Sequence, residues 1–195
     1  MDYPIPYYLS LSSALLLGAV VGSFLNVVIA RLPPWMEGAA ESIVRPASRC
    51  PQCKQGIRWY DNIPLLSFII LGRRCRTCGA PISWRYPLVE AAMALLSAGL
   101  LVRFGLSPEY WIYFIFCAAL LAIFFIDLDH QLIPDVISLP GIGLGFAVAL
   151  LPVGIGWLDS SLGILLGGGI FYPVSYTHLR AHETVLDLVC RLLLE

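Results

Sequence analysis

The sequence predicts an all-α protein, a polytopic bundle of transmembrane helices with a zinc-ribbon-like loop. Three features predict this fold: long charge-free runs, one loop that holds most of the basic residues, and two C-x-x-C pairs in that loop. The chain of 195 residues is 58% hydrophobic and 13% charged, against roughly 25% charged residues in a typical soluble domain. Its mean hydropathy is +0.80. The predicted class is therefore a multi-pass membrane protein.

Runs with little or no charge define the predicted spans. Each is close to the length of about 17–25 residues that a helix needs to cross the hydrocarbon core of a bilayer. The first run has no Lys or Arg before it and is too long for a cleavable signal, so we expect it to remain as a helix. Only Glu90 interrupts the second run. The five runs cover residues 3–30, 86–102, 110–126, 136–158 and 160–177.

The basic residues predict the orientation of these spans. Nine of the 12 Lys and Arg residues lie between the first and second spans. The positive-inside rule makes that loop cytoplasmic and places the amino terminus in the periplasm. Asp127–Asp135 then also emerges on the cytoplasmic side. The net charge is only −1, so we expect no nucleic-acid partner.

Four cysteines form the clearest local motif. "CPQC" covers Cys50–Cys53 and "CRTC" covers Cys75–Cys78, with 21 residues between the pairs. Zinc ribbons bring two such knuckles together so that four thiolates surround one tetrahedral ion. The alternatives are two disulfides, which a reducing cytosol disfavours, or a redox-active pair. We therefore predict a structural zinc bound by Cys50, Cys53, Cys75 and Cys78.

Two further segments suggest how the loop and the first span are arranged. Between the cysteine pairs, a short apolar run begins at Ile63 and is bracketed by charges. It is too short to cross a bilayer, so we expect a re-entrant or interfacial segment packed on the membrane. In the first span, Gly18 and Gly22 permit the close approach of a neighbouring helix.

The stretch "AIFFIDLDHQLIPDVISLP" places Asp127, Asp129 and Asp135 between two apolar runs. Carboxylates are costly at the edge of a bilayer, so they indicate a functional site. Pro134 and Pro140 are expected to prevent a continuous helix through this stretch. We therefore predict a short turn or a broken helix that carries acids at the membrane boundary.

Five blocks in this order resemble the bacterial type IV prepilin peptidases, membrane aspartic proteases that also N-methylate the trimmed pilin. The blocks are "GSFLNVVIARLP" (22–33), the paired C-x-x-C knuckles, "NIPLLSFIILG" (62–72), "RYPLVE" (85–90) and "IDLDHQLIPD" (126–135). The resemblance covers roughly residues 10–172. It implies that Asp127 is one of two catalytic aspartates, the second belonging to a "GxGD" block in a later helix.

The resemblance also implies the substrate, cofactor and location. The substrate is a prepilin or pseudopilin, with a basic leader in the cytosol and a hydrophobic helix in the bilayer. Cleavage between the two requires an acid at the boundary of the bacterial inner membrane. Methyl transfer requires S-adenosylmethionine, and no glycine-rich nucleotide-binding motif occurs in the chain. Its site is therefore expected in the cytoplasmic loop and the helix ends.

The end of the chain departs from this pattern, because no "GxGD" occurs anywhere. The segment "VSYTHLRAHET" resembles a translated sequencing-library adaptor, so residues from about 173 onward are predicted to be non-native. The predicted layout is a first helix (1–30), a zinc-binding loop (31–85), an incomplete peptidase region (86–172) and this tail (173–195). We expect such a fragment to be inactive.

No other acid in the sequence replaces the missing partner. On a helix, Asp127 and Asp129 point about 200° apart and do not converge. Asp135 follows Pro134 and is better explained as an acid at the start of the next helix. Two other functions stay open: a non-catalytic membrane assembly factor whose zinc ribbon docks a partner, and a redox protein that uses its C-x-x-C pairs.

Overall fold

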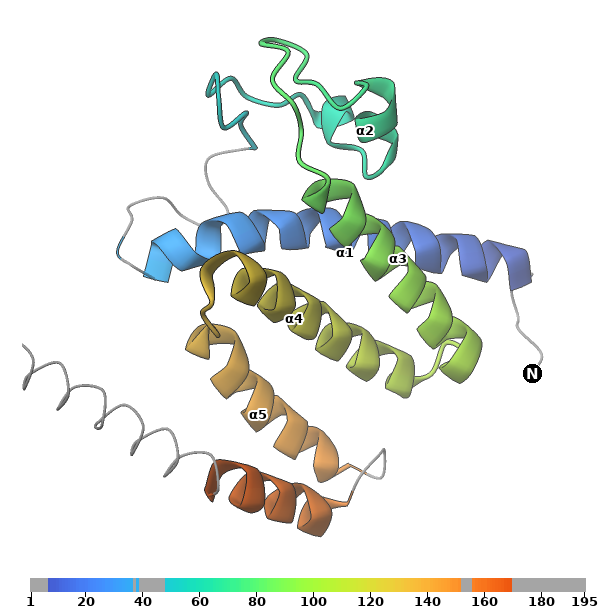
Figure 1. Ribbon diagram of the computed structural model, residues 1–195. Helices are drawn as coiled ribbons and strands as arrows, with labels where there is room; N and C mark the ends of the chain where they lie inside the picture. The colour runs from blue at the N-terminus through green and yellow to red at the C-terminus, as the bar shows by residue number, and fades with distance from the viewer. Residues whose placement is uncertain (1–6, 37, 39–47, 152–155, 170–195) are drawn as a thin grey trace, which may run out of the picture. The chain divides into compact units, whose positions relative to one another are not determined.

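The computed structural model describes residues 7–36, 38, 48–151 and 156–169 (Figure 1). Its helices are α1 (Tyr7–Met36), α2 (Leu66–Ile70), α3 (Arg85–Phe104), α4 (Pro108–His130) and α5 (Asp135–Ala149), with a 3-10 turn η1 (Trp59–Asn62). Residues 157–169 are also helical. The described residues contain two isolated β-bridges and no strand. The predicted all-α class is therefore confirmed.

The chain divides into two compact units, residues 1–141 and residues 142–195. The first unit holds α1 to α4 and the cysteine-containing loop, and its packing is described below. In the second unit, the described residues include the end of α5 and the helical residues 157–169.

Three helices, α1, α3 and α4, are long and apolar enough to cross a membrane. This confirms the prediction of a multi-pass membrane protein, and each helix extends beyond its predicted run. The largest extension is in α1, which was predicted to end at residue 30 and continues to Met36. Pro33 and Pro34 lie in its last turn. Neither residue has an N–H to donate to the carbonyl four residues earlier, so this turn has fewer backbone hydrogen bonds, and α1 ends shortly after it.

The fourth predicted span differs from the structure. One helix was expected over residues 136–158, but α5 ends at Ala149 and the next helical stretch begins at residue 157. A helix of 15 residues is only about 22 Å long, shorter than the ~30 Å hydrocarbon core. The fifth predicted span, residues 160–177, begins three residues early, and its end lies outside the described residues together with the predicted tail from 173.

The acidic stretch is broken as predicted, but at one proline only. Helix α4 ends at His130, and the next residue, Gln131, adopts a left-handed conformation with φ 52° and donates its backbone N–H to the carbonyl of Asp127. The chain then runs without helix through Pro134, and α5 begins at Asp135. The prediction for Pro140 is wrong, because this residue lies inside α5. Pro140 is the sixth residue of α5 and has no N–H to donate to the carbonyl four residues earlier, so α5 continues there with one backbone hydrogen bond fewer.

Within the first unit, α1 and α3 pack in close contact. Figure 1 shows α3 crossing α1, with α4 beside both. A Cβ atom built on Gly18 would lie 2.5 Å from the carbonyl oxygen of Met93, and one on Gly22 would lie 2.7 Å from the Cα of Glu90. Both glycines thus permit the predicted close approach of a neighbouring helix, and that helix is α3. The buried apolar core of this bundle is Ala14, Leu25, Ile29, Leu32, Val89, Met93, Leu101, Tyr110, Phe114, Ala122, Phe125 and Ile126.

Candidate functional site

The first cysteine pair lies in a tight knuckle held by backbone hydrogen bonds. The N–H of Cys50 donates to the carbonyl of Gln55 at 3.0 Å, and the N–H of Lys54 donates back to Cys50 at 2.9 Å. The N–H of Ile57 closes the turn on the carbonyl of Ser48 at 2.8 Å. Lys54 adopts a positive φ of 57°, which turns the chain back directly after the second cysteine.

The second knuckle repeats this pattern 25 residues later. The N–H of Cys75 donates to Ala80 at 2.8 Å, that of Gly79 donates to Cys75 at 2.9 Å, and that of Ile82 donates to Arg73 at 2.8 Å. Gly79 has a positive φ of 71°, at the position equivalent to the lysine of the first knuckle. Each knuckle also has one isolated antiparallel bridge at equivalent residues. The two turns are structural copies of each other.

The structure brings all four predicted cysteines together. The sulfur atoms of Cys50, Cys53, Cys75 and Cys78 lie within 4.8 Å of one another, and those of Cys50 and Cys78 are 3.8 Å apart. In a tetrahedral site with sulfur at about 2.3 Å from the ion, neighbouring sulfurs are about 3.8 Å apart. The cluster therefore has the size and donor set of a four-thiolate metal centre.

Backbone N–H groups prepare the thiols of the knuckles for ionisation. Those of Cys78 and Thr77 lower the pKa of Cys75 to about 6. The N–H of Cys53 likewise lowers the pKa of Cys50 below its ordinary value. The N–H of Ala80 lowers the pKa of Cys78, but loss of solvation and the three neighbouring sulfurs together raise it to about 11. Four thiols this close cannot all ionise without a cation among them.

The loop that holds the cluster has almost no interior of its own. Among the described residues of 48–83, only Cys50 and Ser67 are buried. A segment of this size cannot bury enough apolar surface to offset the entropy of ordering its chain. The residues present thus fit a bound metal ion as the element that holds the loop in place.

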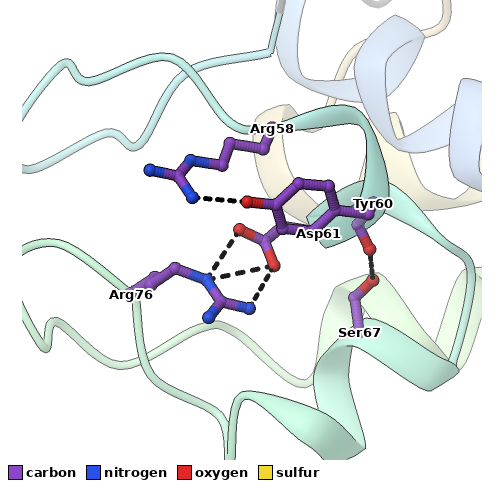
Figure 2. Close-up of polar contacts among 5 residues, drawn as sticks. All are labelled: Arg58, Tyr60, Asp61, Ser67 and Arg76. Carbon is purple, nitrogen blue, oxygen red and sulfur yellow. Dashed lines mark hydrogen bonds and ion pairs between the residues drawn. The ribbon is translucent and has the colours of Figure 1, made fainter.

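A polar cluster joins the segment between the knuckles to the second knuckle (Figure 2). Arg76 donates from Nε and Nη2 to both carboxylate oxygens of Asp61, at 2.6–3.2 Å. The guanidinium groups of Arg58 and Arg76 both lie near the ring of Tyr60. Ser67 donates to the carbonyl of Tyr60 at 3.2 Å. Arg76 lowers the pKa of Asp61, so this acid stays ionised.

A cavity of about 1090 Å³ lies where this loop meets α1 and α3. Glu90, only 7% exposed, lines it and accepts a hydrogen bond from the backbone N–H of Leu65 at 2.8 Å. Asn26 also lines it and donates to the carbonyl of Tyr86 at 3.1 Å. The Oδ1 atom of Asn26 is buried without a partner among the described residues. The cavity thus offers a buried acid and an unused acceptor.

Basic groups line the same cavity. The five arginines on its wall are Arg31, Arg49, Arg58, Arg76 and Arg85. Asp61 and Glu90 are its two acids. A lining with both signs of charge and with apolar side chains such as Phe68 suits a zwitterionic ligand that has an apolar portion.

Asp127 lies in the last turn of α4 with its side chain exposed. Its neighbours Phe125 and Ile126 are buried in the bundle. Asp129 forms an ion pair with Arg85 at the start of α3, and Asp135 is the first residue of α5. No hydrogen bond or ion pair among the described residues connects Asp127 to a second acid. Asp129 is thus engaged by a basic residue, and Asp135 begins a different helix from the one that carries Asp127.

Sequence reasoning missed the cavity and the pair of Arg85 with Asp129. These residues are 44 positions apart, and no spacing rule connects them. One signal was available for the cavity, because Glu90 is the only charge in its apolar run, and a lone acid in a span indicates a site.

Two family models match the chain in succession. The Bacterial Peptidase A24 N-terminal domain matches residues 16–104, and the Type IV leader peptidase family matches residues 114–187. The chain belongs to the type IV leader peptidase family. The second match reaches into the segment from 173 that the sequence predicts to be non-native. No solved structure matches the chain significantly.

Curated relatives carry the name prepilin leader peptidase/N-methyltransferase. One from Myxococcus xanthus is 46% identical over 161 residues, which cover 82% of this chain and 46% of the relative. One from Stutzerimonas stutzeri is 44% identical over 69% of this chain and 53% of the relative. One from Klebsiella pneumoniae is 42% identical over 77% of this chain and 66% of the relative. The chain spans about half the length of the first relatives.

Proposed function

We propose that the protein is a membrane aspartic endopeptidase that cleaves the basic leader of type IV prepilins and pseudopilins, with Asp127 as one catalytic carboxylate. The observation that carries this proposal is an exposed acid in the last turn of an apolar helix of 23 residues. Such a helix is about 34 Å long, so an acid in its last turn lies at the membrane boundary. A scissile bond between a cytosolic leader and a membrane helix lies at the same depth.

The chemistry requires a second acid. In an aspartic protease, the ionised carboxylate takes a proton from water while the protonated one donates to the scissile carbonyl. Asp129 is engaged by Arg85, and Asp135 stands at the start of α5. The partner of Asp127 is therefore expected from a helix beyond those described, in the "GxGD" block that the resemblance implies.

Cleavage of a prepilin by two forms of the protein tests this proposal. The 195-residue chain should not cleave, whereas the chain extended by the carboxy-terminal region of a relative should. In the extended form, Asp127→Asn should reduce the rate at least about 100-fold, while the matched Asp129→Asn should reduce it only a few-fold. A near-normal rate for Asp127→Asn would refute the assignment. Failure of every extended form to cleave would favour the non-catalytic assembly factor.

We propose that Cys50, Cys53, Cys75 and Cys78 bind one structural Zn²⁺. Four sulfurs within 4.8 Å leave no open position for a substrate, which is the arrangement of a structural rather than a catalytic zinc site. Metal analysis of the purified chain should find one zinc per chain. Reversible formation of disulfides with loss of zinc would support the redox alternative instead.

We propose that the cavity binds S-adenosylmethionine, which would supply the methyl group for the new amino terminus of the pilin. Glu90 would face a positive group of the ligand, and the unused acceptor of Asn26 would take an amino donor. Glu90→Gln should weaken binding of S-adenosylmethionine about tenfold in a calorimetric titration. Glu109→Gln, at the start of α4, is the matched control and should bind normally. Equal binding by both variants would exclude this location.

We propose an inner-membrane location with a periplasmic amino terminus and a cytoplasmic cysteine loop. Support comes from the nine basic residues between α1 and α3. Leu106→Cys and Ile133→Cys, both exposed at opposite ends of α4, separate the two orientations in a background with Cys117→Ala and Cys190→Ala. A membrane-impermeant thiol reagent added from the periplasm should label the first and not the second. The reverse pattern would overturn the orientation.

A further inference from the structure

Helix α2 and its flanks expose several apolar side chains, here together called the α2 patch. Ile69 and Ile70 are 73% and 74% exposed, the highest values of the apolar side chains in this loop. The ring of Trp84 packs beside Phe68 at 5.1 Å and is itself largely exposed. An apolar cluster of this kind on a loop indicates a surface that is covered in the working protein. The patch consists of Ile63, Leu66, Ile69, Ile70 and Trp84.

The α2 patch continues into the outer surface of the transmembrane helices. A groove of about 530 Å³ runs from Leu65 and Trp84 to Leu88 of α3 and Leu128 of α4. Leu88 and Leu128 are both exposed, on helices that are long and apolar enough to cross a membrane. The groove thus connects the outer apolar side chains of α3 and α4 with Leu65, directly before α2, and the ion pair of Arg85 and Asp129 also lines it.

A hydrogen bond fixes the depth of α2 relative to the bilayer. The backbone N–H of Leu65, which precedes α2, donates to the carboxylate of Glu90 at 2.8 Å. Glu90 lies in the second turn of α3, whose 20 residues extend about 30 Å, the thickness of the hydrocarbon core. Helix α2 is thus held near the end of α3, at the membrane boundary. Trp84 and Tyr86 at that end are the aromatic types enriched there.

Basic residues follow the patch directly. Gly72 and Arg73 both have positive φ values, and this sharp turn leads the chain from α2 back to the second knuckle. The guanidinium of Arg73 lies 4.7 Å from the ring centre of Trp84, and Arg74 is exposed. Apolar side chains beside exposed arginines match the layered chemistry of a membrane surface with anionic headgroups.

We propose that the α2 patch anchors the cysteine loop to the bilayer that α3 and α4 cross. Leu66, Ile69 and Ile70 lie among the acyl chains at the boundary, and Arg73 and Arg74 contact anionic headgroups. This anchoring requires only that α3 and α4 span the membrane, and it does not depend on the peptidase activity. It holds the zinc-binding loop against the membrane, beside the helix end that carries Asp127.

Photochemical labelling from within the bilayer tests the anchor. The whole chain is reconstituted in vesicles of phosphatidylcholine and phosphatidylglycerol that contain a lipid with a diazirine on its acyl chain. After illumination, mass spectrometry should find lipid adducts on residues 66–70 as well as on α3 and α4, and none on residues 50–58 of the first knuckle. The double variant Ile69→Asp/Ile70→Asp should lose at least nine-tenths of the adducts on residues 66–70.

The controls make the result decisive. Adducts on α3 and α4 should stay unchanged in the double variant, and its bound metal should equal that of the wild type, which excludes general unfolding. Ile57→Asp places the same charge on an exposed isoleucine of the first knuckle and should leave all adducts unchanged. Absence of adducts from residues 66–70 in the wild type would overturn the proposal. Cross-linking of these residues to a second copy of the chain would overturn it as well.

Discussion

The cysteine loop, residues 48–83, and the bundle of α1, α3 and α4 are stabilised in different ways. Every member of the buried apolar core belongs to the bundle, whereas the described residues of the loop bury only Cys50 and Ser67. The loop instead has two knuckles closed by backbone hydrogen bonds around four sulfurs. The bundle thus depends on packing, and the loop on a small number of polar contacts and on four cysteines that could hold a metal ion.

This difference determines how each region responds to a substitution. In the bundle, Gly18 and Gly22 allow the backbones of α1 and α3 to touch. A larger side chain at either position is therefore expected to push the two helices apart. In the loop there is open space around Gly56, so added volume is tolerated there, whereas loss of one ligand is not. Damage to either region should therefore leave the other largely intact.

The largest effect is expected from Cys75→Ser, which removes one of the four sulfur ligands. Structural zinc contributes about 10–16 kcal/mol of apparent binding free energy in zinc-finger peptides, and the loop has no core to replace it. Bound zinc should fall from one per chain to less than about a tenth. Amide hydrogen exchange should lose protection across residues 48–83 and keep it in α1, α3 and α4.

Cys117→Ser is the matched control, because Cys117 lies in α4 outside the cluster. It should bind zinc normally. If Cys75→Ser kept its zinc and the protection of the loop, the metal would not be what holds this region. If instead the bundle also lost protection, the two regions would not be independent.

The second largest effect is expected from Gly22→Ala, which should lower the stability of the bundle. In Gly22→Ala, the new methyl group would meet the Cα of Glu90 at 2.7 Å and the carbonyl oxygen of Val89 at 3.0 Å. Both are backbone atoms that cannot move aside, so α1 and α3 must separate at a cost of about 1–3 kcal/mol. Unfolding in increasing SDS should begin at a lower detergent fraction, with zinc content unchanged.

Gly99→Ala tests whether the loss of stability in Gly22→Ala comes from the contact between α1 and α3 and not simply from replacing a glycine in a helix. Gly99 lies in α3, and a methyl group added there would meet no atom of another helix within 4 Å. Alanine favours a helix over glycine by about 1 kcal/mol, so this variant should be unchanged or slightly more stable. Equal destabilisation by both substitutions would show that the close approach of α1 and α3 is unimportant.

The features predicted well from sequence are those set by local spacing. Charge-free runs predict α3 and α4 because each helix must contain its own apolar length. The C-x-x-C spacing predicts two knuckles because each one closes within about ten residues, as from Ser48 to Ile57. The angular separation of Asp127 and Asp129 follows from helical geometry alone, and the pairing of Asp129 with Arg85 agrees with it.

The features that sequence could not predict depend on distant neighbours. Nothing local distinguishes Pro140, which α5 tolerates, from Pro134, which lies in the break. The cavity forms only because α3 brings Glu90 beside Leu65 of the loop.

The smallest effect is expected from the ion pair of Asp61 and Arg76, which links the two halves of the loop (Figure 2). Asp61→Asn should lower the melting temperature of the zinc-bound loop slightly, because exposed pairs contribute little. Arg76→Gln should do the same, and the double variant should be no worse than either single one. Arg74→Gln, which alters the neighbouring arginine, is the control and should have no effect.

The pH dependence of the difference in melting temperature between wild type and Asp61→Asn tests whether the charge of Asp61 is its cause. Arg76 lowers the pKa of Asp61 below its ordinary value of 3.8, so the pair stabilises the folded loop above that pH and the stabilisation is lost as pH falls through the lowered pKa. The melting temperatures of wild type and Asp61→Asn should therefore differ by the same amount at pH 7 and pH 5. A difference that shrank between these values would mean that Asp61 already binds a proton there. That result would contradict the lowered pKa of Asp61, whereas a difference that persisted as pH fell through the lowered pKa would assign the loss to packing and not to the charge pair.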